Sequence, residues 1–131
     1  VKEHSMKNIE GLQDFRESVI VVKRDGMYHF TWSCDDTGSE NYHVNYGISK
    51  SLYGPVEYQG TILEKNPELD ILGTGHHSIL KDTDGQYYIA YHRFATPWEC
   101  IKTGKGFHRE LCIDKLEFDE NNRIKKVVVT K

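Results

Sequence analysis

The sequence reads Ser18-Val-Ile-Val-Val-Lys-Arg-Asp-Gly-Met-Tyr-His-Phe-Thr-Trp32, and this stretch returns, one residue shorter, as Ser78-Ile-Leu-Lys-Asp-Thr-Asp-Gly-Gln-Tyr-Tyr-Ile-Ala-Tyr91. The turn glycines of the two copies, Gly26 and Gly85, are 59 positions apart. A fixed period of that size is typical of repeat architectures, in which each copy is one supersecondary unit. The sequence therefore predicts two copies of the same structural unit.

The first copy begins with a predicted β-hairpin. Residues 19–22 and 27–32 are rich in β-branched and aromatic side chains, and the Asp-Gly pair between them is a strong hairpin signal. Two more strand-like runs follow at residues 42–49 and 56–62. These four runs predict one antiparallel meander.

The second copy repeats this plan. No stretch has a convincing helical period, apart from a short turn at residues 66–70. We therefore expect an all-β protein made of two four-stranded antiparallel meanders. The four strand-like runs of the second copy are residues 77–80, 86–91, 109–118 and 124–129.

Two such meanders in tandem are typical of neighbouring blades of a β-propeller, which has about 4–8 blades. Two blades cannot close a ring and would leave strand edges open, a hazard that native proteins avoid. We therefore expect residues 1–131 to be part of a larger propeller, with blades over approximately 15–65 and 66–131. The structural alternative is a self-contained β-sandwich of about eight strands.

Composition narrows the classes of partner. The net charge of −3 provides no basic field, so we expect no nucleic acid. No apolar run approaches the roughly 20 residues that cross a bilayer, so we expect no membrane partner.

The N-terminus has neither a signal-peptide pattern nor an initiator Met, which predicts a processed start or a piece of a longer chain. Cys34, Cys100 and Cys112 lack C-x-x-C spacing and predict ordinary thiols.

Four segments then carry a resemblance by their order and spacing. They are Phe15-Arg-Glu-Ser18; Tyr42-His-Val-Asn-Tyr-Gly-Ile-Ser-Lys-Ser-Leu-Tyr-Gly-Pro55; Gly73-Thr-Gly-His-His-Ser78 with Tyr87-Tyr-Ile-Ala-Tyr-His-Arg93; and His108-Arg-Glu-Leu-Cys-Ile-Asp-Lys-Leu-Glu-Phe118. With these segments the chain resembles glycoside hydrolase family 43, five-bladed β-propeller enzymes that act on arabinose- and xylose-containing polysaccharides. The resemblance runs from about residue 8 to residue 130 and implies the C-terminal portion of the catalytic domain.

The resemblance implies that Glu17 is the general acid of a glycosidase. That role needs a carboxylic acid that is still protonated near neutral pH and reaches the glycosidic oxygen, as in a partly desolvated pocket beside a second carboxylate. The family usually has a small residue and then Pro after this Glu, whereas this chain has Ser18-Val19. Without the resemblance, Glu17 would be interpreted as an exposed glutamate at a strand start.

The resemblance also implies that His76 is the histidine at the propeller axis, which commonly contacts a central Ca²⁺. Calcium prefers oxygen ligands, so one histidine would be a minor part of a hydrated shell. His77 should then point away, because neighbours on a strand alternate faces. From the residues alone, a lone histidine is more often a satisfied core residue.

Four further residues are considered for substrate binding. Arg109 matches an arginine that reaches into the sugar subsite in many family members, since guanidinium can donate paired hydrogen bonds; otherwise it would pair with Glu110 or with a cross-strand partner. Arg93 is a weaker candidate that would equally brace the following loop. Trp98 is the better sugar-stacking candidate, and Trp32 is the other, although aromatic side chains at strand ends more often pack.

The family is described as inverting, with a base Asp and a pKa-tuning Asp in two earlier blades that this chain lacks. Asp14 and Asp25 lie too close to Glu17 in sequence to replace them. We therefore expect a fragment that is inactive alone and needs the N-terminal blades and an oligo- or polysaccharide substrate. The alternative is a non-catalytic carbohydrate-binding propeller or pseudoenzyme. The family makes a secreted or periplasmic location plausible, and the sequence does not choose among xylosidase, arabinofuranosidase, arabinanase and galactan-directed activities.

Overall fold

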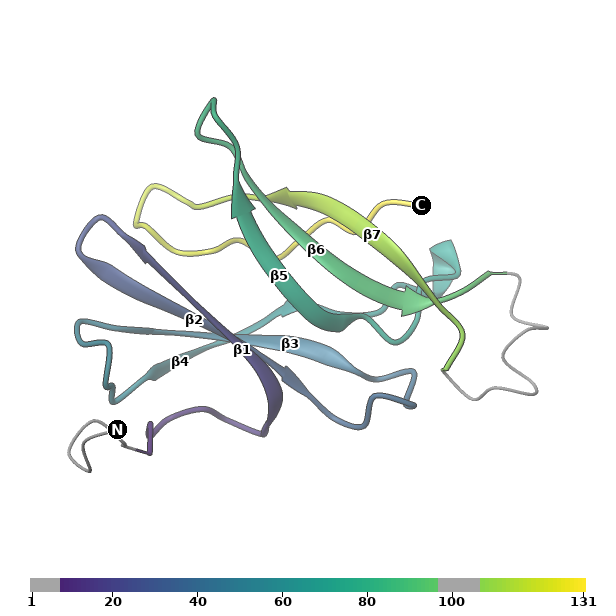
Figure 1. The fold of residues 1–131 in the computed structure, drawn as a ribbon, viewed down its shortest axis with the longest axis horizontal. Coiled ribbons are helices and arrows are strands. Elements are labelled where there is room, and N and C mark those ends of the chain that lie inside the picture. Colours follow the sequence, from purple (N-terminus) through teal and green to yellow (C-terminus); the bar gives the residue numbers. More distant parts are fainter. Residues whose placement is uncertain (1–7, 97–106) are drawn as a thin grey trace.

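The computed structural model describes residues 8–96 and 107–131 of the chain. Its strands form two antiparallel meanders with the orders β1-β2-β3-β4 and β5-β6-β7, stacked on one another in Figure 1. Within these described ranges, no helix has the length and apolar character needed to cross a membrane. The elements are β1 (Phe15–Arg24), β2 (Met27–Cys34), β3 (His43–Ser49), β4 (Glu57–Leu63), η2 (Pro67–Leu69), β5 (Gly75–Lys81), β6 (Tyr87–Phe94) and β7 (Arg109–Leu116).

The expected all-β fold and its two meanders are confirmed, but the second sheet has three strands instead of four. Residues 124–129, expected to be its fourth strand, run beside β7 in Figure 1 without forming a ladder with it. Val127 donates its N–H to Ile62 of β4, in the other sheet, at 2.7 Å. Lys125 and Lys126 are both exposed, which breaks the alternation that a strand needs. The segment therefore bridges the two sheets.

The main core lies between the two sheets. Val44, Tyr46 and Ile48 of β3 face Ile89 and Tyr91 of β6, and all five side chains are buried. Apolar side chains of the C-terminal segment close this core on one side. Burying such side chains stabilises a fold by about 1.5–3 kcal/mol each, so this layer holds the sheets together.

A second, smaller core covers the opposite face of the first sheet. Trp32 is fully buried there, and its indole Nε1 donates to the carbonyl of Gln13 at 2.8 Å. Ile9 and Leu12 of the N-terminal segment pack over it. Cys34 is part of the same cluster, and burial raises the pKa of its thiol to about 11. Trp32 thus packs as a core residue, and Cys34 is a structural thiol.

The two sheets share one irregularity at the start of their first strands. The ladder of β1 slips between Glu17 and Ile20, and the ladder of β5 slips between Gly75 and Ser78. Ser18 and His76 sit in these bulges with positive φ angles of 59° and 49°. A bulge bends a strand and re-aims its side chains, and such features are often found near functional sites.

Candidate functional site

Glu17 and His76, both predicted from the sequence as site residues, lie together at one end of the two sheets. This end contains the starts of β1 and β5 and the end of β6, because an antiparallel meander brings the starts of odd strands beside the ends of even ones. We call the group there the Glu17 cluster. Its members are Glu17 of β1, Tyr42 just before β3, His76 of β5 and His92 of β6.

Glu17 makes both of its contacts through one carboxylate oxygen. The Tyr42 hydroxyl donates to Glu17 Oε1 at 2.8 Å, and His76 Nδ1 lies 3.8 Å from the same atom. Oε2 makes no hydrogen bond to any other residue in the described ranges. The Glu17 side chain is 42% exposed, and of its two oxygens only Oε1 is held by a hydrogen bond from a described residue.

Aromatic rings form the floor of the cluster. The His92 ring stacks on Tyr42 at 5.7 Å between centroids and on His76 at 5.8 Å. Burial, and then the charge of Arg109, lower the pKa of His92 to about 4, so the ring is neutral at pH 7. Burial, with the adjacent Glu17 carboxylate, raises the pKa of Tyr42 to about 12. Tyr42 therefore remains a hydrogen-bond donor across the physiological range.

His76 and His77 point to opposite sides, as expected. The His76 side chain is 60% exposed beside Glu17, and its backbone N–H donates to Ser33 Oγ at 3.0 Å. His77 is buried, with Nε2 at 2.6 Å from Thr31 Oγ1 of the other sheet. Within residues 8–96 and 107–131, no three His, Cys, Asp or Glu side chains are grouped to hold a metal. These donors do not form a calcium site by themselves.

Arg109 lies at the edge of the Glu17 cluster. Its Nη2 donates to the Thr37 hydroxyl at 2.8 Å and to the Thr37 carbonyl at 3.2 Å. Its positive charge adds to the lowering of the pKa of His92 and partly offsets the raised pKa of Tyr42, so Arg109 lies near both rings. Its buried Nε has no hydrogen-bond partner among the residues that the structure describes. The role of Arg109 in sugar binding stays a prediction, with one donor still unused.

Arg93 is not brought to the cluster. It follows His92 on β6, so its side chain projects from the other face of the sheet. There Nε donates to Glu110 at 2.7 Å and Nη1 donates to the Thr130 carbonyl at 2.9 Å. These contacts fit the bracing alternative. Trp98, the preferred sugar-stacking candidate, lies outside the described residues.

Two members of the cluster were missed by the sequence reasoning. Tyr42 and His92 were quoted only as parts of longer motifs. The available signal was position: Tyr42 directly precedes the third strand, and His92 pairs with Gly75 next to the predicted axial histidine. Using that signal required the register of the second sheet, which the β5 bulge shifts.

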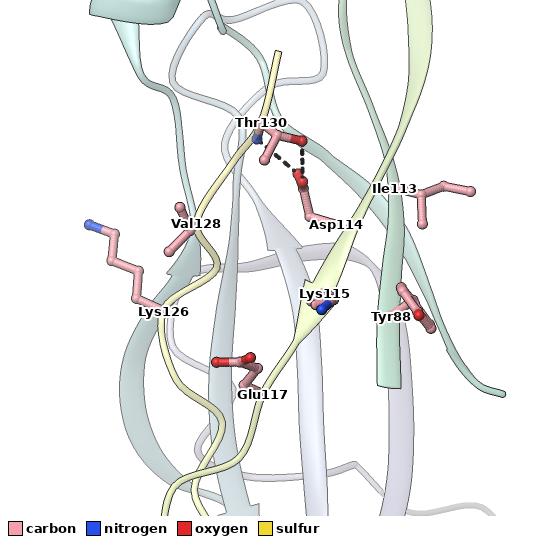
Figure 2. A pocket seen from close by; sticks show the side chains of 8 residues that line it. All are labelled: Tyr88, Ile113, Asp114, Lys115, Glu117, Lys126, Val128 and Thr130. Carbon is pink, nitrogen blue, oxygen red and sulfur yellow. Dashed lines mark hydrogen bonds between the residues drawn. The ribbon is translucent and has the colours of Figure 1, made fainter. Parts of the chain in front are cut away.

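A pocket of about 410 Å³ lies elsewhere, between β7 and the C-terminal segment. Figure 2 shows Asp114 bonded to Thr130 at one end of it, with Lys126 and Val128 on one side and Ile113 on the other. None of its lining residues belongs to the Glu17 cluster. The pocket lies where the C-terminal segment runs beside β7 without a ladder, so it is separate from the Glu17 cluster.

The chain is similar to known carbohydrate-active enzymes. The sequence model of glycosyl hydrolases family 43 matches residues 2–124. The chain is 28% identical over 118 residues to a beta-D-galactofuranosidase of Aspergillus niger, a match that covers 90% of this chain and 33% of that protein. It is 32% identical over 115 residues to a beta-xylosidase of Xylanibacter ruminicola, covering 86% and 31%. The chain thus spans about a third of the length of these relatives.

Solved structures give the same result. A thermostable family-43 glycoside hydrolase matches with a TM-score of 0.72 and 26% identity, covering 87% of this chain and 35% of that one. A structure described as a glycoside hydrolase matches with a TM-score of 0.78 and 28% identity, covering 93% and 27%. The two sheets are therefore blades of a β-propeller, as the repeat predicted.

Proposed function

Because the chain belongs to glycosyl hydrolase family 43, we propose that it carries the general acid of an enzyme that hydrolyses glycosidic bonds in arabinose- or xylose-containing polysaccharides. Glu17 is the acid. The observation that supports this assignment is the unequal treatment of its two oxygens: Tyr42 holds Oε1, and the described residues leave Oε2 free on a partly exposed side chain. A general acid needs one oxygen free to deliver its proton.

In the proposed reaction, Glu17 gives its proton to the glycosidic oxygen as the carbon–oxygen bond breaks. A second carboxylate, about 6.5–9.5 Å from the acid in inverting enzymes, takes a proton from the attacking water. Asp25 lies in the turn at the other end of β1, and within the described residues no hydrogen bond or ion pair joins Asp14 to Glu17. We assign the base and the pKa-tuning aspartate to other blades of the protein, so this chain alone would be inactive.

The same proposal sets the partners of the chain. They are a polysaccharide or oligosaccharide substrate and the remaining blades of the propeller. A calcium ion at the propeller axis would meet this chain through His76, with its oxygen ligands supplied by water and by the other blades. We also propose that the protein is secreted or periplasmic, because polysaccharides are degraded outside the cell.

The test replaces Glu17 in the intact protein that contains these blades. A general acid matters most when the leaving oxygen is a poor leaving group. Glu17→Ala should lower kcat/KM by about a hundredfold or more on a methyl glycoside or oligosaccharide and far less on the matching 4-nitrophenyl glycoside. The measurement is the ratio of kcat/KM on the methyl glycoside to kcat/KM on the 4-nitrophenyl glycoside. Repeating it with xylopyranosides, arabinofuranosides and galactofuranosides identifies the sugar that the enzyme prefers.

Equal losses on both substrates would show that Glu17 is not the acid. A protein that binds oligosaccharides but hydrolyses neither substrate would favour the non-catalytic alternative. The matched control is Glu110→Gln, a carboxylate that pairs with Arg93 away from the Glu17 cluster and should leave the rate ratio unchanged.

A further inference from the structure

We propose that Tyr42 is a positioning residue for Glu17, which fixes the oxygen that delivers the proton and stabilises the carboxylate left behind. The inference rests on the proposed function of Glu17. It starts from the hydrogen bond that joins the Tyr42 hydroxyl to Glu17 Oε1 at 2.8 Å, the one hydrogen bond to the Glu17 carboxylate in the described part of the chain.

Tyr42 is held in place on several sides. The residue is fully buried, whereas Glu17 is partly exposed. The His92 ring stacks against the Tyr42 ring with an interplanar angle of 14°. Gly75 approaches it so closely that an added Cβ would stand 2.4 Å from ring atom Cε1. The Thr74 hydroxyl donates to the Tyr42 carbonyl at 3.4 Å. A ring so enclosed presents its hydroxyl at one point.

The bond has a chemical consequence for a protonated Glu17. The O–H of Tyr42 already points at Oε1, so a proton on that oxygen would meet a second donor. We therefore place the acid proton on Oε2, the oxygen that has no hydrogen-bond partner among the described residues. This matters because a general acid must present its proton in the direction of the leaving oxygen.

The bond also changes strength during the reaction. As the Oε2–H bond breaks, the proton moves to the glycosidic oxygen, the glycosidic carbon–oxygen bond breaks, and Glu17 becomes a carboxylate. Hydrogen bonds to a charged acceptor are roughly twice as strong as neutral ones. Tyr42 thus stabilises the product side of proton transfer more than the starting state, and its contribution appears in kcat.

His76 does not replace this contact. Its Nδ1 is 3.8 Å from Glu17 Oε1, beyond hydrogen-bond distance, and its ring is more than half exposed. His92 stacks on the Tyr42 ring and makes no hydrogen bond to Glu17 within the described part of the chain. Of the cluster residues, Tyr42 is therefore the one whose loss leaves Glu17 Oε1 without a donor.

The experiment compares Tyr42→Phe with wild type in the intact enzyme, on a methyl glycoside and on the 4-nitrophenyl glycoside of the same sugar. Phe keeps the ring that packs on His92 and Gly75 and removes only the hydroxyl. We expect kcat on the methyl glycoside to fall about 10–100-fold, KM to change by less than about twofold, and the loss on the 4-nitrophenyl glycoside to be much smaller. The ratio of the two rates does not depend on the fraction of folded enzyme.

The matched control is Tyr91→Phe. Tyr91 is a buried tyrosine whose hydroxyl donates to the Asp114 carboxylate at 2.7 Å, away from the Glu17 cluster. Its removal should change stability and leave the rate ratio as in wild type. A Tyr42→Phe enzyme that behaves like Tyr91→Phe in the rate ratio would overturn the inference.

Glu17→Gln measured in parallel separates the two claims. If Glu17→Gln shows the selective loss and Tyr42→Phe does not, the positioning role is wrong and the assignment of the acid stands. If Glu17→Gln loses both activities equally, the assignment of the acid fails and the role of Tyr42 fails with it. Selective losses in both variants support both claims.

Discussion

His77 connects the two sheets at the scale of one side chain. It is 3% exposed, and its ring contacts Thr31 of the neighbouring sheet. Burial, and then the nearby His76, lower the pKa of His77 to about 4. An unfolded histidine has a pKa near 6.5, so between pH 6.5 and 4 the unfolded chain binds a proton that the folded chain does not. The free energy of unfolding that depends on a neutral His77 is therefore fully present above pH 6.5. It is lost as the pH falls from 6.5 towards 4, because protonation favours the unfolded chain.

Replacing His77 should make the pH dependence of unfolding shallower. We expect His77→Gln in the intact protein to remove about 2 kcal/mol of the stability difference between pH 7.5 and pH 4.5, because Gln does not titrate. Urea unfolding at both pH values measures this difference. His29 and His92, whose pKa values are also lowered to about 4, leave a slope in the variant. Identical slopes in the variant and wild type would contradict the prediction.

The family resemblance predicted part of the cluster, whereas residue identity alone did not. Glu17 and His76 were singled out separately, and the structure brings them to 3.8 Å. The sequence did not place Tyr42 and His92 with them, because that depends on two bulges that shift the strand registers. Bulges are produced by local backbone choices at non-glycine positions, Ser18 and His76, for which the residue types give little warning.

At the scale of elements, the C-terminal segment is held by side chains more than by a ladder. Asp114 accepts from the backbone N–H and the hydroxyl of Thr130, and Arg93 donates to the Thr130 carbonyl. Arg93 also pairs with Glu110 at 2.7 Å, where its own side chain is 10% exposed. The segment covers the main core with Val127 and other apolar residues. Arg93 therefore ties the last residues of the chain to β6 and β7.

Arg93→Met should loosen this tie. We expect the intact protein to lose about 2–3 kcal/mol of unfolding free energy, because Glu110 and the Thr130 carbonyl would lose their buried donor. Chemical denaturation measures the loss, and hydrogen exchange should quicken over residues 124–130. The control is Lys125→Met, which removes an exposed pair with Glu117 and should cost under about 1 kcal/mol. Unchanged stability with weakened substrate binding would instead support the sugar-binding role expected from the sequence.

Element prediction succeeded where periodicity was clear and failed where two lysines interrupted it. The runs that became β1 to β7 were recognised from β-branched and aromatic residues, turn signals and the repeat of the hairpin, and the turn at 66–70 was also expected and contains η2. Residues 124–129 have a strand-like composition, yet Lys125 and Lys126 put two exposed residues in succession. Composition alone does not show that Val127 donates to β4 instead of β7.

At the scale of the whole molecule, both sheets present apolar side chains to solvent. Leu111 and Ile113 of β7 are 73% and 55% exposed, and Val19 and Val21 of β1 are 45% and 38% exposed. Large exposed apolar patches usually mark interaction surfaces. In a propeller, neighbouring blades pack face to face, so these residues fit the places where further blades would sit.

The isolated 131-residue chain should therefore associate or bind a hydrophobic dye. We expect light scattering to show species larger than a monomer, and anilinonaphthalene sulfonate fluorescence to rise, relative to the intact protein. Leu111→Lys with Ile113→Glu should reduce both signals, because these side chains lie on the exposed face of β7. A soluble monomer that unfolds cooperatively without dye binding would favour the free-standing β-sandwich.

The paired bulges have a consequence for how this family can diversify. Ser18 and His76 have no paired residue on the neighbouring strand. The ladders continue from Ile20 in the first sheet and from Ser78 in the second. An exchange at these two positions therefore leaves the hydrophobic layers largely unaffected. Substitution at the bulge residues can therefore change the chemistry at the end of each blade while the paired ladders keep their packing. Glu17 lies just before the first bulge and stays paired with Ser33, whereas His76 lies inside the second.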